Sequence, residues 1–233
     1  MATGFLCILI VSTKRRYCQT CHFPEVTCVC AAVQPIASSI TPIILQHPNE
    51  QGHTKNTARL IELVLPQTQV YIGERLEDFI ELRESLVGKS CWLLYPDSRA
   101  MVYDVGADRL ESSHAKSDNT INNLIEHPSW PTHLLLIDAT WRKAQKMYAL
   151  NPWLKQLPCV KLQALETSQY LIRKHKNKQS LSTIESLMMC LFKREPKVAD
   201  ALNKLFVHFK DVKVSAMPES IQQKLLNTNK VDI

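Results

Sequence analysis

Short apolar runs alternate with amphipathic stretches along the chain from residue 40 onward. The apolar runs are only a few residues long and are bounded by Pro, Asn or Asp, which is typical of buried β-strands. They predict strands at residues 42–46, 69–72, 91–95, 133–138 and 159–162.

The amphipathic stretches carry apolar side chains near helical spacing. Within residues 74–86 these side chains are Leu76, Phe79, Ile80, Leu82 and Leu86. The same spacing predicts helices at residues 56–65, 74–86, 141–150, 182–192, 197–209 and 219–227. Strands that alternate with helices indicate an α/β fold with a mostly parallel sheet. The polar stretch 104–131 predicts a long surface loop.

Polar residues follow several of the predicted strands, at 46–50, 96–98, 138–141 and 163–164. In open α/β sheets, ligands bind beyond the carboxyl ends of the strands. These segments therefore form the default candidate site.

The composition is typical of a globular protein. Hydrophobic residues make up 45% of the 233 residues, and there are only five glycines. This length can bury one sizeable core. The net charge of +6 and the pI of about 8.9 suit an anionic partner such as a nucleic acid, without identifying one.

No apolar run reaches the roughly 20 residues that a membrane-spanning helix needs. The longest run, residues 4–11, has no positive flank before it and no small-residue cleavage site after it, so it is a poor signal peptide. We therefore expect a cytoplasmic protein without membrane contact, in which residues 1–14 are a leader of unknown role. In that reducing compartment the eight cysteines should be thiols or metal ligands.

Four cysteines crowd together in the pattern Cys18-x2-Cys21-x6-Cys28-x-Cys30. Four thiolates can close a tetrahedral zinc shell with Zn–S distances of about 2.3 Å. Unconnected buried thiols or a redox pair are the alternatives, but the density of the cluster favours a metal. Because protein ligands would fill every coordination position, the zinc would be structural. We expect a small four-cysteine zinc module at residues 15–36.

The predicted strand 133–138 ends in Asp138-Ala139-Thr140-Trp141, an Asp-x-Thr-Trp motif. Other blocks accompany it in order along the chain: the cysteine cluster, His47-Pro48-x-Glu50, Asn56-Thr57-Ala58-Arg59-Leu60, Leu94-Tyr95-Pro96, Ile172-Arg173-Lys174 and Leu181-Ser182-Thr183-Ile184-Glu185. Over roughly residues 15–205, this arrangement resembles the DTW-domain family of tRNA-uridine aminocarboxypropyltransferases.

The resemblance implies transfer of the 3-amino-3-carboxypropyl group of S-adenosylmethionine to N3 of a tRNA uridine, with release of methylthioadenosine. It also implies a SPOUT-like catalytic domain with a knotted cofactor site, which we expect at residues 37–233. Two features depart from the family. Residues 1–14 match nothing in it, and Ala139 stands where Gly is more usual. Ala keeps a small side chain but loses the backbone freedom of Gly.

Asp138 is the candidate base for this reaction. N3 of uridine is a weak nucleophile while it holds its proton, and a positioned base typically contributes about 10²–10⁴ in rate. Burial at a strand end would raise the pKa of Asp138 above the usual value of about 3.9. The alternative is that Asp138 accepts backbone N–H bonds at the start of the next helix. The sequence leaves both roles open.

Thr140 either caps the helix predicted from Trp141 or touches the donor. Trp141 has a flat face for stacking of adenine or uracil, or else it packs the start of that helix; the resemblance favours the site. With Asp138 and Glu185, they are the candidate catalytic residues. The candidate residues for binding S-adenosylmethionine are Tyr95, Pro96, Asp97, Ala139, Thr140, Trp141, Ala164, Ser182 and Thr183.

The pair Ser182-x-x-Glu185 is a capping box ahead of an apolar helical segment. A capped helix N-terminus also favours a carboxylate, so the donor's methionine carboxylate can bind there. The two roles are compatible.

The basic segment 173–178 precedes this helix directly. Such charge runs are usually solvated surface, but its position favours contact with phosphates. His47 is interpreted as a hydrogen-bonded loop residue, in a turn that Glu50 ties down. The candidate RNA contacts are Lys55, Arg59, Arg142, Lys143, Arg173, Lys174 and Lys176.

Two rival functions remain open. One is a SPOUT-type RNA methyltransferase that uses the same donor, and the other is a non-catalytic RNA-binding protein that contains zinc. The expected partners are tRNA and S-adenosylmethionine, and the expected state is a monomer. The sequence does not specify which uridine or which tRNA is the acceptor.

Overall fold

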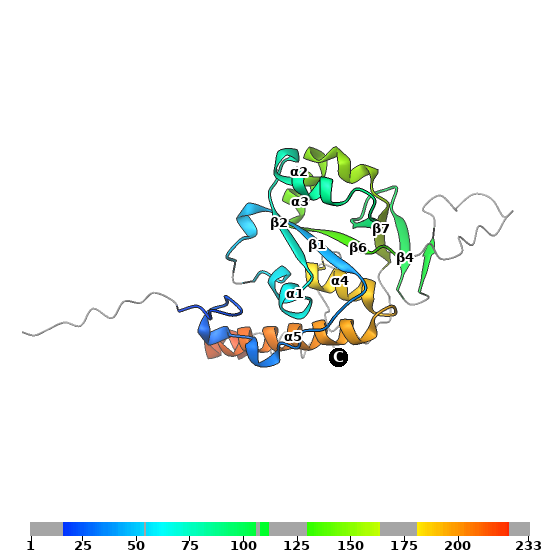
Figure 1. Cartoon of the computed structure of the whole chain (residues 1–233). Helices are drawn as coiled ribbons and strands as arrows, with labels where there is room; N and C mark the ends of the chain where they lie inside the picture. Colours follow the sequence, from blue (N-terminus) through cyan, green and yellow to red (C-terminus); the bar gives the residue numbers. More distant parts are fainter. Residues whose placement is uncertain (1–15, 54, 106–107, 112–129, 164–180, 224–233) are drawn as a thin grey trace, which may run out of the picture.

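The computed structural model describes residues 16–53, 55–105, 108–111, 130–163 and 181–223 (Figure 1). Its centre is a seven-stranded sheet in the order β2-β1-β6-β3-β7-β4-β5. Strand β5 runs antiparallel to β4, and the other neighbours are parallel, so the predicted α/β fold with a mostly parallel sheet is confirmed. The strands are β1 (Thr41–Gln46), β2 (Gln69–Ile72), β3 (Cys91–Leu94), β4 (Met101–Asp104), β5 (Arg109–Glu111), β6 (His133–Asp138) and β7 (Cys159–Gln163).

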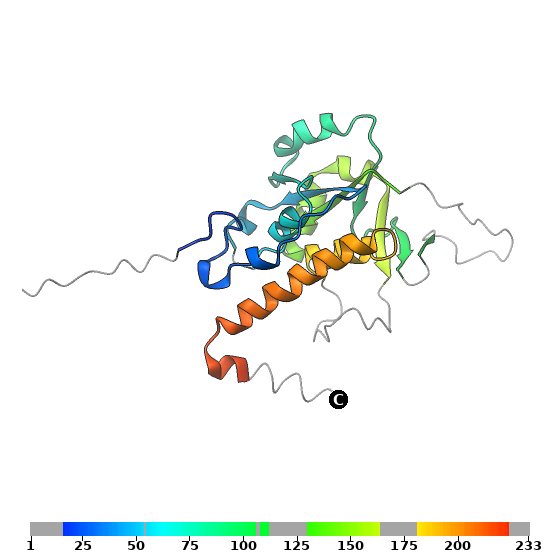
Figure 2. The ribbon, with the colours of Figure 1, turned by 60° about the horizontal axis from the view of Figure 1, so that its bottom comes forward.

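Helices cover both faces of the sheet (Figures 1 and 2). Helices α2 and α3 lie on one face, α1 and α4 lie on the other, and α5 packs against α1 and α4 as an outer layer. The helices are α1 (Ala58–Val64), α2 (Ile80–Ser85), α3 (Trp141–Leu150), α4 (Thr183–Leu191) and α5 (Pro196–Ser215). The short 3-10 helices are η1 (Glu25–Thr27), η2 (Cys30–Ala32), η3 (Pro48–Glu50), η4 (Leu76–Phe79) and η5 (Pro152–Gln156).

Strand β6 shows why the sheet needs both layers. Leu135 packs with the core under α2 and α3, whereas Leu134 and Leu136 pack with the core under α1, α4 and α5. Strand β1 alternates in the same way, with Ile43 on the first side and Ile44 on the second. Strands that are buried on both faces read as continuous apolar runs. For this reason the central strands were readily found from the sequence.

The cysteine-rich N-terminal segment packs onto the body of the protein. Phe23 and Val29 belong to the same hydrophobic core as α1, α4 and α5. The Phe23 ring lies 5.1 Å from the ring of Phe209 on α5, and the Ile36 N–H donates to the carbonyl of Val64 at the end of α1. The segment and the outer helix therefore stabilise each other.

The prediction of a surface loop at residues 104–131 was wrong at its start. Strand β4 ends at Asp104, and Arg109–Glu111 forms β5 at the edge of the sheet. In β4 the Tyr103 side chain is fully buried and its strand neighbours are partly buried; no strand was predicted there, although residues 100–103 form a short apolar run. Residues 112–129 lie outside the described part of the chain.

Two helix predictions also needed correction. The predicted helix 74–86 begins as η4 and becomes α-helical only from Ile80. Helix α5 continues six residues beyond the predicted end at 209, because Val212 still packs against the core although its neighbours are polar. Of the predicted helix 219–227, residues 219–223 are helical and the rest lie outside the described residues.

Within the described residues, no helix is both long enough and apolar enough to cross a membrane. The leader at residues 1–14 lies outside the described part. The connection between β7 and α4, residues 164–180, also lies outside it. The knotted cofactor site therefore stays a prediction.

Candidate functional site

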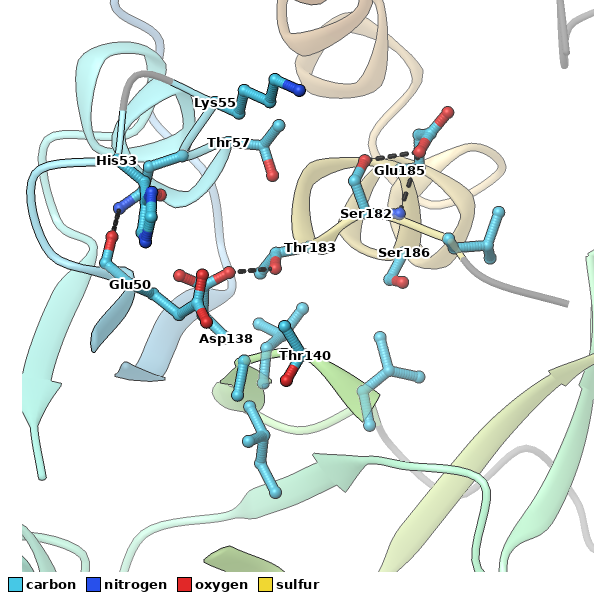
Figure 3. Close-up of a pocket in the computed structure, with 16 residues that line it drawn as sticks. Glu50, His53, Lys55, Thr57, Asp138, Thr140, Ser182, Thr183, Glu185 and Ser186 are labelled. Atoms are coloured by element: carbon cyan, nitrogen blue, oxygen red, sulfur yellow. Dashed lines mark hydrogen bonds between the residues drawn. The ribbon is translucent and has the colours of Figure 1, made fainter. Parts of the chain in front are cut away.

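The carboxyl ends of β1 and β6 bring two polar side chains together. Gln46 pairs with Asp138 in the register of these strands, and its Nε2 donates a hydrogen bond to Asp138 Oδ2 at 2.9 Å. Thr183, the first residue of α4, donates from Oγ1 to Asp138 Oδ1 at 2.6 Å (Figure 3). Asp138 thus joins two strands to the N-terminus of α4.

Asp138 lines a cavity of about 470 Å³ at this edge of the sheet (Figure 3). The end of β6, the segment between η3 and α1, and the start of α4 form its walls. Its volume falls within the range of small-molecule sites, about 300–1,000 Å³. The region beyond the strand ends, which the sequence indicated as the default site, therefore contains a cavity. The polar residues Glu50, Lys55, Thr140 and Ser182 line it.

Burial raises the pKa of Asp138 above its usual value, and the nearby Glu50 carboxylate raises it further. Hydrogen bonds from Thr183 and Gln46 lower this pKa, but the net direction is upward. A carboxylate with a raised pKa is a better proton acceptor than an exposed one. The Asp138 carboxylate also ties elements together, through side chains on β1 and α4. The sequence had suggested backbone N–H groups at the start of α3 as its partners instead.

An ion pair and a hydrogen-bonded histidine shape the turn after β1. Lys143 on α3 contacts Glu50 at 3.0 Å, which draws the lysine to the rim of the cavity. His47 Nδ1 accepts the N–H of Asn49 at 3.0 Å, and its Nε2 lies 3.4 Å from Glu74 Oε1. The interpretation of His47 as a hydrogen-bonded loop residue is confirmed.

The N-terminus of α4 carries the predicted capping box. The Ser182 N–H and Oγ both donate to Glu185 Oε2, at 2.9 and 2.5 Å. Glu185 is buried and lines the cavity, but this oxygen is committed to the helix end. The geometry therefore favours a structural role for Glu185 over a role as proton acceptor.

Replacing Glu185 by Gln is accordingly expected to leave activity within a few-fold of wild type, because Gln also completes a capping box. Glu185→Ala should lower the free energy of unfolding by about 1 kcal/mol, since it removes the acceptor of the partly buried Ser182 N–H. Thermal or urea unfolding measures the effect on stability, and an activity assay measures the other. A Gln variant that folds normally but has lost activity would restore Glu185 as a catalytic candidate.

Three aromatic rings form a stack beside the cavity. The rings of Tyr95 and Tyr148 have centroids 4.5 Å apart, and Trp141 lies 6.0 Å from Tyr95 at an interplanar angle of 14°. Trp141 is 58% exposed and does not pack into the core. Neither Trp141 nor Tyr95 is among the described residues that line the cavity.

The four clustered cysteines converge on one point. Their Sγ atoms all lie within 4.8 Å of one another, with Cys18 3.6 Å from Cys30 and Cys21 3.7 Å from Cys28. A tetrahedral shell with Zn–S bonds of about 2.3 Å has S–S edges of about 3.8 Å. Backbone N–H groups of Cys21 and Thr20 lower the pKa of Cys18 to about 6, whereas burial and the neighbouring thiols raise the pKa of Cys30 to about 12. The residues present therefore fit zinc.

The model of the DTW domain matches residues 15–213 of the chain. The chain belongs to the DTW-domain family. It is 32% identical over 185 residues to tRNA-uridine aminocarboxypropyltransferase 2 of Drosophila melanogaster, covering 76% of this chain and 66% of the fly protein. It is 29% identical over 182 residues to the enzyme of the same name from Mus musculus, covering 76% of this chain and 56% of that protein.

A plant relative extends the match. The chain is 26% identical over 219 residues to tRNA-uridine aminocarboxypropyltransferase A of Arabidopsis thaliana, covering 85% of this chain and 80% of the plant protein. The fly and mouse relatives are longer, and the matched part of this chain spans between about half and two thirds of their length. No solved structure gives a significant match.

The DTW-domain fold gathers part of the predicted site. Around the cavity it brings together Lys55, Asp138, Ala139, Thr140, Ser182, Thr183 and Glu185. It places Tyr95 and Trp141 in the stack, and Asp97 accepts hydrogen bonds from Tyr148 and Arg99. Neither Pro96 nor Asp97 is among the described residues that line the cavity. The predicted Ala164, Arg173, Lys174 and Lys176 lie outside the described residues.

The structure adds cavity residues that the sequence had not singled out as a site. His53, Asn56, Thr57 and Ser186 also line the walls. Asn56 and Thr57 fall in a block shared with the DTW-domain family, so the signal was present. Ser186 follows the capping box by one residue and had no distinguishing feature.

Arg59, a predicted RNA contact, faces the cysteine cluster. Its Nη1 donates to the carbonyl oxygen of His22 at 3.0 Å, and its guanidinium lies 5.4 Å from the centre of the Phe23 ring. His22 follows Cys21 directly and has a positive φ of 55°. Arg59 therefore supports the loop between the two pairs of cysteines.

We expect Arg59→Ala to lower the free energy of unfolding by about 1–2 kcal/mol, through loss of the hydrogen bond and the cation–π contact. Arg142→Ala is the matched control, because Arg142 is exposed on α3. It should leave stability unchanged and reduce the salt dependence of RNA binding. If Arg59→Ala leaves stability unchanged but flattens the salt dependence, Arg59 contacts RNA.

Proposed function

We propose that the protein transfers the 3-amino-3-carboxypropyl group of S-adenosylmethionine to N3 of a tRNA uridine. One observation carries the proposal: a carboxylate with a raised pKa, Asp138, lines a ligand-sized cavity in a chain of the DTW-domain family. The names of the fly, mouse and plant relatives support the choice of reaction.

In the proposed reaction Asp138 takes the proton from N3 of the uridine. The N3 electron pair attacks the methionine-chain carbon bonded to sulfur, and a new C–N bond forms. The C–S bond breaks, its electrons stay on sulfur, and neutral methylthioadenosine leaves. The site selects this carbon over the methyl group by holding it in line with N3, which is control by proximity and orientation.

The cavity walls suit the amino-acid end of the donor, which carries both an ammonium and a carboxylate. Glu50 and Asp138 present negative charge on one side (Figure 3). Lys55 and the N-terminus of α4 suit a carboxylate. We place the methionine moiety between these two groups.

We propose that Cys18, Cys21, Cys28 and Cys30 hold a structural zinc ion. Four protein thiolates leave no open coordination position, so the ion would stabilise the fold and take no part in transfer. Phe23, in the loop between the pairs of cysteines, packs against α5. The metal would thereby fix one end of the outer helix.

The RNA-binding residues are also part of the proposal. Lys55 and Arg142 are exposed, and Lys143 lies at the rim of the cavity. We propose that they contact tRNA phosphates together with Arg173, Lys174 and Lys176, consistent with the net charge of +6.

Calorimetry with S-adenosylmethionine alone separates this function from a non-catalytic RNA-binding protein. The proposal expects saturable binding that weakens when Glu50 or Lys55 is replaced by Ala. Mass spectrometry of tRNA nucleosides after incubation with enzyme and donor then identifies the modified base. A protein that binds tRNA but shows no heat of donor binding and no modified nucleoside would contradict the proposal.

A further inference from the structure

Trp141 is a large aromatic side chain that the fold leaves exposed. It is 58% exposed at the start of α3, although its neighbour Ala144 and the later Met147 and Tyr148 are buried. Tryptophan usually contributes to stability by burying its ring. Here one side of the ring is turned to Tyr95, with the two planes only 14° apart, and much of the ring remains open to solvent.

The rings beneath Trp141 are held in place. Tyr95 stacks on Tyr148, whose hydroxyl donates to Asp97 Oδ2 at 2.6 Å. Arg99 donates to the same hydroxyl at 2.8 Å and to the carbonyl of Lys155 at 2.7 Å. The stack is therefore pre-organised. A flat group that stacks on Trp141 binds without a further entropy cost for ordering the two tyrosine rings.

The stack stands next to the reaction site. Trp141 directly follows Thr140, and Tyr95 directly follows Leu94; both Thr140 and Leu94 line the cavity. The indole itself is not among the described lining residues. Because the indole does not line the cavity and is exposed, a ligand held inside the cavity leaves the indole open to a second group.

We infer that Trp141 is the stacking platform for an unpaired tRNA base that flanks the target uridine, and that it does not bind the adenine of the donor. The inference rests on the proposed function and deepens it. Aromatic stacking is the common way to hold single-stranded nucleic acid, because every base has a flat π-face. The next residue along α3, Arg142, is also exposed and is available to a phosphate.

Tryptophan fluorescence tests the contact directly. The protein has four tryptophans: besides Trp141, Trp92 and Trp153 are 5% and 8% exposed, and Trp130 is partly buried against the core. Unmodified tRNA or a short oligouridylate should quench wild-type emission through Trp141, and Trp141→Phe should lose most of that quenching while keeping RNA affinity. S-adenosylmethionine alone should leave the Trp141 emission nearly unchanged. Quenching by the donor but not by RNA would overturn the inference.

Kinetic measurements provide a second test. Trp141→Ala is expected to raise KM for tRNA by about 5- to 150-fold, the range for losing one stacked base. Trp141→Phe should restore most of the loss, and the affinity for S-adenosylmethionine should not change. Val87→Ala, which removes another exposed apolar side chain, is the matched control and should leave KM as in wild type. A KM for tRNA within twofold of wild type in Trp141→Ala would contradict the inference.

The two tests distinguish a failure of this inference from a failure of the proposed reaction. If wild-type protein transfers the group normally but Trp141→Ala has a normal KM and RNA causes no quenching, the stacking platform is wrong and the function stands. If wild-type protein transfers nothing while RNA still quenches Trp141, the reaction is wrong and the RNA contact stands.

Discussion

Replacing Asp138 by Asn is expected to lower the rate of aminocarboxypropyl transfer by about two to four orders of magnitude, with the fold and donor binding retained. Asn cannot take the N3 proton. It keeps both observed hydrogen bonds, because its Oδ1 still accepts from Thr183 and its Nδ2 can donate to Gln46 once that amide turns over. Single-turnover rates with saturating donor measure the effect.

The dependence on pH separates a base from an anchor. A more alkaline solution supplies uridine that is already deprotonated, so Asp138→Asn should regain part of its rate as the pH rises. If Asp138 only anchors α4, Asn should be mild and Ala severe, and neither should recover at high pH. A nearly wild-type rate for Asp138→Asn would exclude the base role.

The direction of the pKa shift adds a check on the wild-type enzyme. In the proposed reaction Asp138 acts as the carboxylate, so kcat/KM should fall as the pH drops through a pKa above the usual value of about 3.9. Because the folded-state pKa is raised, the carboxylate form is disfavoured by folding. Stability from this group therefore declines as the pH rises from the unfolded-state pKa through the folded-state pKa. Asp138→Asn should remove that decline.

Replacing Cys28 by Ser is expected to reduce zinc from about one ion per chain to a small fraction and to destabilise the protein by several kcal/mol. Structural zinc sites contribute apparent free energies of about 10–16 kcal/mol in small peptides. Here the loss of the metal would also weaken the packing of the body of the protein, because Phe23 and Val29 belong to the main hydrophobic core. Elemental analysis and thermal unfolding measure the two effects.

Cys159→Ala is the matched control for this variant. Cys159 is buried against the opposite core and lies outside the cluster, so the variant should lose packing energy but keep its zinc. Wild-type protein that is freshly purified and contains no zinc would rule out the metal site.

The central strands and the cysteine cluster could be predicted from the sequence because their signals are local. Strand β6 is an apolar run that ends in a charged residue, and the register of β1 against β6 places Asp138 at the sheet edge. The capping box at Ser182 and Glu185 depends on residues three apart. Local spacing of this kind carries over into the structure directly.

The contacts that define the site are long-range and gave no sequence signal. Gln46, Asp138 and Thr183 meet only because β1, β6 and α4 pack together. Arg59 was predicted to contact RNA, and its partner His22 lies 37 residues away in the chain. Charge indicates that a residue can bind an anion, but packing decides which neighbour it meets.

Dual labelling of the donor tests the central claim most directly. S-adenosylmethionine labelled in its methyl group and, separately, in its carboxyl group is incubated with the protein and unmodified tRNA. The account predicts that the carboxyl label enters tRNA as a modified uridine, while the methyl label leaves with methylthioadenosine. Methyl label in tRNA, with the carboxyl label recovered in S-adenosylhomocysteine, would show a methyltransferase and contradict the account.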